Sequence, residues 1–319
     1  MLLLYLPMSS TYTLSDDCGL TASFTPFGAT WLSAKFHDRE LLLGHANVAA
    51  YATERSFLGC MVGRYANRIA GSRYVLDGQE VKLPPNEGPN LLHGGSPGYH
   101  LRDWTLLYAD NRELRLKLHS PDGDQGFPGA LDVELSYRIT GPGEVRLSWT
   151  ARCSKPCPVN LTNHSYFNLD GTEERIDAHR VRLEALRVLP VDWAGLPKGE
   201  PEPVNGTRFD LREWSPVLGP DGAGYDHCFI GSGAQVRSGD GRVQLDIGTS
   251  LPGLQYYTGR HLTGSRGRTG RNFPAFAGFA IEPQYWPDSP NHPGWPSAVV
   301  RPGEVQAHHI LYRFSTPAA

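Results

Sequence analysis

The chain has 319 residues, of which 39% are hydrophobic and 20% charged, and its formal net charge is -3. This length suits one large domain, and the charge leaves no basic surface for a phosphate backbone, so we expect no nucleic-acid partner. No stretch approaches the roughly 18–20 apolar residues of a membrane helix. The apolar start at residues 1–7 lacks a cationic leader and is interrupted by Pro7, so we predict no secretion signal there.

Strands are predicted wherever apolar and polar residues alternate with a period of two. Five segments show this pattern, in chain order 113–118, 131–139, 144–149, 181–189 and 243–247. Turn-forming clusters separate them, and the 36 glycines and 26 prolines are spread along the chain. No segment shows a long helical period. The sequence therefore predicts an all-β fold, a large antiparallel β-sandwich with few short helices, in a single domain over residues 1–319.

The cysteines favour a reducing compartment. Their odd number and irregular spacing do not form a disulfide framework. They are Cys18, Cys60, Cys153, Cys157 and Cys228. We expect a cytoplasmic protein, as a monomer or homodimer.

Residues 264–271, Gly-Ser-Arg-Gly-Arg-Thr-Gly-Arg, form a basic and glycine-rich segment. A phosphate-binding loop would need a terminal Lys-Ser/Thr pair and a following helix, and both are missing. We expect a flexible surface loop near the functional site.

A histidine among small polar and aromatic residues marks the most informative stretch, 163–169, Asn-His-Ser-Tyr-Phe-Asn-Leu. A lone histidine is more often a hydrogen-bonded core residue than a catalytic one. Here four further motifs accompany it in order. They are Gly-Arg-Tyr-Ala-Asn-Arg-Ile at 63–69, Asn-Leu-Leu-His-Gly-Gly at 90–95, Tyr-Asp-His at 225–227 and Ala-Ile-Glu-Pro-Gln at 280–284.

From about Phe57 to the C-terminal strand, this ordered set resembles the aldose 1-epimerase (galactose mutarotase) family. The resemblance implies the galactose mutarotase-like supersandwich fold and the interconversion of α and β anomers of free hexoses such as galactose and glucose. Opening a cyclic hemiacetal requires one group to take the proton of the C1 hydroxyl and another to protonate the ring oxygen. Neither a metal nor another cofactor is needed, and a monosaccharide is the expected partner.

Glu282 is the candidate base and His164 the candidate acid. Glu282 follows the apolar segment 276–281, where an unpaired charge is costly, so the carboxylate needs a reason to be there. The alternative from sequence alone is a structural ion pair with an arginine. The family resemblance assigns the general base to this position and the proton donor to His164.

The family's sugar-binding motifs match Asn67, Arg68, His93, Asp226 and Gln255. Each has a plain structural alternative, in the same order a turn residue, a salt bridge, a loop histidine, a cap and a solvent-facing strand residue. His93 or Arg68 can also stabilise negative charge on the C1 oxygen. Four aromatic residues beside the motifs are candidates for the pocket wall. They are Tyr166, Phe167, Tyr225 and Trp286.

No metal site is expected. His308 and His309 are neighbours that would point to opposite faces of a strand, and Cys153 and Cys157 lack a second pair at zinc-site spacing. Two other functions stay open. One is a carbohydrate-binding protein without turnover, and the other is an epimerase of a phosphorylated or otherwise modified sugar, with charge supplied by the arginines of 264–271.

Overall fold

Strands dominate the computed structural model, which describes residues 10–53 and 56–317. Within these ranges the helical segments are short 3-10 turns, and none is long and apolar enough to cross a membrane. The turns are η1 Val48–Thr53, η2 Ala70–Ser72, η3 Tyr99–Leu101, η4 Asp124–Gly126, η5 Leu262–Gly264 and η6 Ser289–Asn291. The all-β prediction is confirmed. Residues 1–7, for which no secretion signal is predicted, lie outside the described residues.

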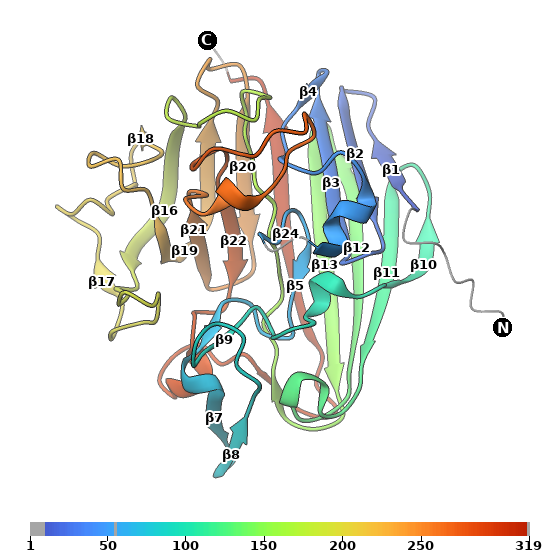
Figure 1. Ribbon diagram of the computed structural model, residues 1–319, viewed down its shortest axis with the longest axis vertical. Helices are drawn as coiled ribbons and strands as arrows, with labels where there is room; N and C mark the ends of the chain where they lie inside the picture. Colours follow the sequence, from blue (N-terminus) through green and yellow to red (C-terminus); the bar gives the residue numbers. More distant parts are fainter. Residues whose placement is uncertain (1–9, 54–55, 318–319) are drawn as a thin grey trace.

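One antiparallel sheet of 12 strands forms the main body of the molecule (Figure 1). Its main path runs β10 Thr105–Ala109, β11 Glu113–Ser120, β12 Leu131–Gly141, β13 Glu144–Cys153, β24 Gln306–Ser315, β20 Gln244–Thr249, β19 Asp226–Arg237, β16 Arg180–Val188 and β17 Glu202–Pro203. Three strands lie off this path. β18 Ser215–Pro216 pairs with β16, and β21 Gly253–Tyr257 pairs with both β19 and β22 Ala280–Gln284.

The five segments predicted from alternation are all strands of this sheet, namely β11, β12, β13, β16 and β20. In β12 the buried positions alternate strictly with more exposed ones, because successive side chains of a strand point to opposite faces. His308 and His309 are neighbours on β24, the strand position from which their opposite orientation was predicted.

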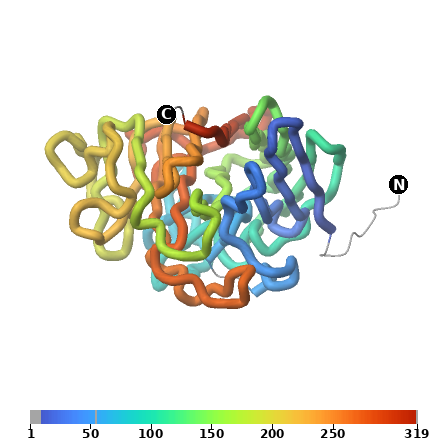
Figure 2. Tube along the Cα trace, turned by 90° about the horizontal axis from the view of Figure 1, so that it is seen from above, coloured from blue at the N-terminus to red at the C-terminus, as the bar shows by residue number. Residues whose placement is uncertain are grey.

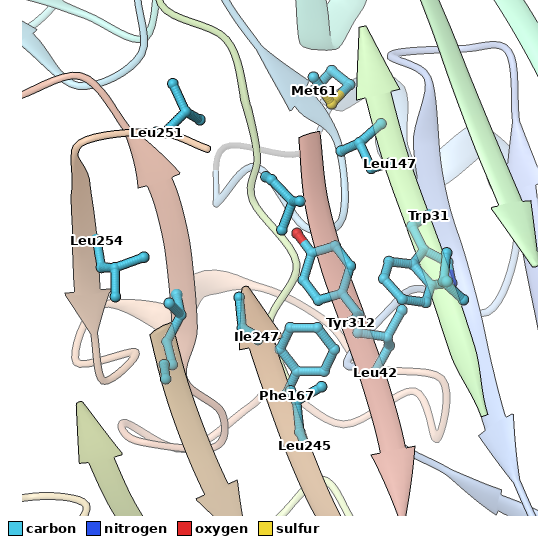
Figure 3. Packing of buried hydrophobic residues seen from close by; sticks show 14 of the residues in the cluster. Trp31, Leu42, Met61, Leu147, Phe167, Leu245, Ile247, Leu251, Leu254 and Tyr312 are labelled. Carbon is cyan, nitrogen blue, oxygen red and sulfur yellow. The ribbon is translucent and has the colours of Figure 1, made fainter. Parts of the chain in front are cut away.

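A second, four-stranded sheet covers the half of the large sheet around β12, β13 and β24. It consists of β1 Tyr12–Ser15, β2 Leu20–Thr25, β3 Thr30–Phe36 and β4 Arg39–Glu40. The rings of Phe24 and Tyr137 stack with centroids 4.2 Å apart, and those of Trp31 and Tyr312 meet edge to face at 5.1 Å. Figure 3 shows Trp31, Phe167 and Tyr312 together in this layer. These contacts make the sandwich.

The same buried cluster continues to the other half of the large sheet, where Leu183 of β16, Phe229 of β19 and Ile281 of β22 belong to it. Viewed from above, the N-terminal strands lie on one side and the yellow-to-orange strands on the other (Figure 2). This continuity supports the single domain over residues 1–319, which stays a prediction.

Four short strand pairs organise the remaining loops. They are β5 Met61–Val62 with β15 Thr162–Asn163, β6 Arg68–Ile69 with β9 Leu91–Leu92, β7 Arg73–Leu76 with β8 Gln79–Lys82, and β14 Cys157–Pro158 with β23 Val299–Val300. The first two pairs matter for function because they hold candidate site residues at or next to their ends.

The basic loop 264–271 is bonded to the rest of the fold, which argues against the predicted flexibility. The guanidinium of Arg268 donates hydrogen bonds to the carbonyl oxygens of Leu32 and Leu42, and Glu173 accepts the backbone N–H of Arg268 at 2.6 Å. The composition of the segment correctly indicates a loop, but it does not show that the guanidinium of Arg268 is held by main-chain carbonyl oxygens.

Candidate active site

Three predicted residues form a row on one wall of a pocket. Glu282 lies on β22, Gln255 is its register partner on β21, and Asp226 is on β19 two residues before Cys228, the partner of Gln255. Residues two apart in a strand share a face, so the three side chains follow one another across three adjacent strands. The amide of Gln255 donates to Asp226 at 2.6 Å. With strands about 4.8 Å apart, the row spans roughly 10 Å.

Loops that are tied together by the short strand pairs form the opposite wall. His164 directly follows β15, and its N–H donates to the carbonyl of Cys60 at 2.8 Å. Arg68 opens β6, and His93 directly follows β9, the partner of β6. The predicted residues of the separate motifs are therefore brought to one place by local pairing of their flanking segments.

His164 and Glu282 meet across the two walls. Nε2 of His164 lies 3.5 Å from Oε1 of Glu282, and both side chains are almost fully buried. Burial, and secondarily repulsion from Asp226, raises the pKa of Glu282 well above its usual range, although Arg68 opposes this. Burial lowers the pKa of His164 to about 4. Of the two ways to place one proton on the pair, burial therefore favours a neutral carboxyl on Glu282 beside an uncharged His164 over a carboxylate beside an imidazolium.

No arginine is ion-paired with Glu282 among the described residues, so the alternative of a structural Arg-Glu pair is wrong. Its Oε2 is buried and has no hydrogen-bond partner in the described part of the chain. An unpaired buried carboxylate oxygen is unfavourable for folding, and it is available to accept a proton or hydrogen bond from a ligand.

His93 is fixed as a neutral hydrogen-bond donor. Its Nδ1 accepts the backbone N–H of Asn67 at 3.1 Å, which places the ring proton on Nε2. Burial, followed by the nearby His164 and Arg68, holds the pKa of His93 well below its usual value. The ring is thus uncharged, and the hydrogen bond from the main chain of Asn67 fixes its orientation, so Nε2–H can donate to an oxygen in the pocket.

The same proton argues against a metal centre. His93, His164 and Glu282 each offer an atom within 4.8 Å of the others, which is a spacing that invites a cation. A metal needs a free lone pair on each imidazole, yet one nitrogen of His93 accepts an N–H and the other carries the proton. The donor set therefore fits a metal poorly.

Arg68 has both of the roles that were considered from the sequence, because it forms a structural salt bridge and it also lines the pocket. Its Nε and Nη2 each donate to Glu87 at 2.7 Å, which leaves Nη1 outside this bidentate pair. Asn67 is a turn residue with φ of 63°, and its Oδ1 accepts the N–H of Arg68 at 2.9 Å. For both residues the structural and binding roles are compatible.

All seven predicted site residues line one pocket of about 190 Å³. Of the four aromatic candidates, Tyr166 lines it, whereas Phe167 and Tyr225 are buried in the main core and Trp286 packs against Trp295. Six lining residues were not predicted: Ser56, Phe57, Glu87, Leu92, Tyr257 and His261. Tyr257 had a signal, since it lies two residues after Gln255 on the same face of β21.

A family model described as aldose 1-epimerase matches residues 10–313. The chain belongs to the aldose 1-epimerase family. The aldose 1-epimerase of Escherichia coli K12 is 41% identical over an alignment 325 residues long, gaps included, and this alignment covers 95% of this chain and 94% of that protein. The galactose mutarotase of Bos taurus is 39% identical over 317 residues, covering 93% of this chain and 91% of that protein.

The fold agrees with this membership. The solved structure of a GalM/aldose epimerase homologue from C. elegans has a TM-score of 0.93 and 29% identity, covering 97% of this chain and 100% of that one. The family match begins at residue 10, so the resemblance extends further towards the N-terminus than the motifs alone indicated from about Phe57. The strands β1 to β4 are part of the family fold.

Proposed function

We propose that the chain is an aldose 1-epimerase that interconverts the α and β anomers of free hexoses such as galactose and glucose. The observation that carries the proposal, beside family membership, is the buried pair of Glu282 and His164 in a pocket otherwise lined by hydrogen-bonding groups and aromatic rings. Such a pair supplies the base and the acid that hemiacetal opening requires.

The sugar is oriented with its C1 and ring-oxygen end against this pair. Glu282 takes the proton of the C1 hydroxyl while His164 gives a proton to the ring oxygen, so the C1–O5 bond breaks and an aldehyde forms. Rotation about the C1–C2 bond then presents the other carbonyl face. The reverse proton transfers close the ring, and no proton or electron is gained or lost overall.

A proton held by Glu282 must move to His164 before this step, because the base has to be ionised and the acid protonated. A sugar hydroxyl that donates to the unpartnered Oε2 of Glu282 stabilises the carboxylate and so favours transfer of the proton to His164. Substrate binding thereby prepares the pair. Nε2–H of His93 and the charge of Arg68 lie in the same pocket and can stabilise negative charge on the C1 oxygen.

The far end of the sugar contacts Asp226 and Gln255 at the end of the three-strand row away from Glu282. Asp226 accepts hydrogen bonds from sugar hydroxyls, and the amide of Gln255 can accept or donate them. Asn67 and Arg68 line the same pocket. Phe57, Tyr166 and Tyr257 supply aromatic surface for the apolar face of the ring. This arrangement suits a neutral polyol, and the chemistry calls for neither metal nor cofactor.

The alternatives fare less well. A binding protein without turnover would need the polar lining but not a desolvated His–Glu pair, whose burial is costly. For a phosphorylated sugar, none of the three arginines of 264–271 lines the pocket, and Arg271 is paired with Glu174 at 3.2 Å. We also propose a cytoplasmic location, which the five free cysteines support, and a monomeric or homodimeric state.

Polarimetry of freshly dissolved α-galactose and α-glucose tests the function. The parent should accelerate mutarotation beyond the spontaneous rate, and Glu282→Gln, which keeps the shape of the side chain, should remove most of the acceleration while sugar affinity stays within a few-fold. Equal rates for parent and variant would remove Glu282 as the base. No acceleration of either sugar by the parent would refute the proposed reaction on these substrates.

A further inference from the structure

Trp193 is 98% exposed, which is exceptional for the largest aromatic side chain. It lies in the loop that follows β16, between Pro190 and Pro197. Isolated exposed apolar residues need no explanation, but a fully exposed indole is a flat apolar surface on which a sugar ring can stack if the indole lies near a sugar site.

The loop under Trp193 is fixed by its own hydrogen bonds. Oδ1 of Asp192 accepts the N–H groups of Ala194 at 2.8 Å and Leu196 at 3.0 Å, and the N–H of Asp192 donates to the carbonyl of Leu196 at 2.9 Å. Val191 and Pro197 form a bridge at the base of the turn. The backbone thus presents the indole at the tip of an ordered turn.

The turn continues the row of site residues across the sheet. Glu282, Gln255 and Asp226 occupy β22, β21 and β19 in that order, and β16, from which the loop departs, is the next strand beyond β19. Where β16 ends, the N–H of Leu189 donates to the carbonyl of Cys228 on β19 at 2.8 Å. The loop therefore begins on the side of Asp226 that faces away from the acid–base pair.

Gly195 connects the turn to the pocket itself. It has φ of 74°, and a Cβ added there would lie 2.8 Å from Nη1 of Arg68, so the main chain rests directly on this pocket arginine. Trp193 is two residues away, and its Cα is therefore within about 7 Å of that of Gly195. The exposed indole is therefore carried by the same short turn that covers Arg68, a residue that lines the pocket.

We propose that Trp193 is a platform for the second ring of a reducing disaccharide whose rings are joined through O4. The inference rests on the proposed function, because it places C1 of the reducing ring at Glu282 and His164. In a pyranose O4 lies across the ring from C1, so a substituent on O4 leaves the pocket past Asp226 and Arg68, towards Trp193. O6 branches from C5 beside the ring oxygen, so a ring attached there leaves near the acid–base pair.

The test compares maltose and lactose, which are linked through O4, with melibiose, which is linked through O6, and with glucose. Trp193→Ala should raise KM for maltose and lactose about two- to ten-fold, the usual range for one aromatic stacking contact, and leave KM for glucose and melibiose within two-fold. Trp193→Tyr should restore most of the loss. Leu186→Ala is the matched control, since Leu186 is also an exposed apolar residue, at 70%, but lies within β16.

Calorimetric binding of the same sugars keeps the inference testable if turnover is absent. A parent that does not accelerate glucose mutarotation refutes the proposed function, whereas a loss of maltose affinity in Trp193→Ala still supports the platform. The platform is overturned if maltose and lactose are unaffected, or if glucose is affected equally, which would mean that the turn acts only through Arg68. A change in molecular mass on Trp193→Ala, with unchanged maltose affinity, would instead assign the indole to contact with a second copy of the chain.

Discussion

Replacing the base should make the protein more stable as well as inactive. Glu282 is 2% exposed, and Oε2 has no hydrogen-bond partner among the described residues. A buried group without a partner costs about 1–3 kcal/mol and more when it is charged, and Glu282→Gln keeps the volume and a polar side chain but cannot ionise, so it should raise the free energy of unfolding at pH 8 by roughly 1–3 kcal/mol. Thermal unfolding followed by circular dichroism measures it.

The gain should depend on pH with a defined sign. The pKa of Glu282 is raised in the folded protein, so its protonated form is compatible with burial and its ionised form is not. The stability that goes with protonation is fully present below the unfolded-state pKa of about 4.3 and is lost as pH rises through the folded value. The difference in Tm between Glu282→Gln and the parent should therefore be small near pH 4 and grow towards pH 8.

Glu87→Gln is the matched control, because Glu87 also lines the pocket but is paired with Arg68 and its side chain is 36% exposed. It should not stabilise the fold. A Tm difference for Glu282→Gln that is the same at pH 4 and pH 8, or that is negative at pH 8, would refute the view that Glu282 is a desolvated, strongly perturbed carboxyl.

Three further outcomes are expected. Arg68→Ala should raise KM for galactose about ten-fold or more with a smaller effect on kcat, and a steady-state assay with unchanged KM would contradict a binding role. In a pH–rate profile, activity should fall as pH rises through the raised pKa of Glu282, because the pair then loses the proton that His164 gives to the ring oxygen; a loss of activity with decreasing pH at a value above the ordinary carboxyl range would instead show that a proton on Glu282 blocks the base. Arg64 is 2% exposed, and its guanidinium donates to the Gly129 carbonyl at 2.7 Å and to Oγ of Ser120 at 2.6 Å, so Arg64→Met, which leaves these buried acceptors without a donor, should lower the free energy of unfolding by roughly 1–3 kcal/mol in urea titrations, whereas an unchanged value would show that these bonds matter little.

The strands that could be predicted from the sequence are those in which apolar and polar residues alternate regularly. β11, β12 and β13 have one buried and one more exposed face, so their pattern is explicit in the residues. β19 and β21 were not predicted from periodicity. β21 is buried at four of its five positions, and β19 carries three register irregularities or changes of partner along 12 residues, so neither shows a simple period.

The site was predictable where a residue belongs to a sequence motif, and less so where a contact depends on loop closure. Glu87 reaches the pocket only because it pairs with Arg68, 19 residues earlier in the chain, and nothing in its neighbourhood announces that pairing. The orientation of His93 was equally hidden, since a main-chain N–H determines it. The structural and the sugar-binding interpretations of Asn67 and Arg68 also do not exclude each other. Both residues make hydrogen bonds within the protein, and both line the pocket.

The two walls of the pocket differ in how freely they can change. Glu282, Gln255 and Asp226 stand on neighbouring strands of one sheet, and their spacing is set by main-chain hydrogen bonds that do not depend on side-chain identity. Arg68, His93 and the turn that carries Trp193 belong to loops or their short strand pairs, where substitutions and length changes are tolerated more easily. Within such a scaffold, sugar preference can diverge among descendants through the loops while the proton-transfer chemistry is inherited unchanged.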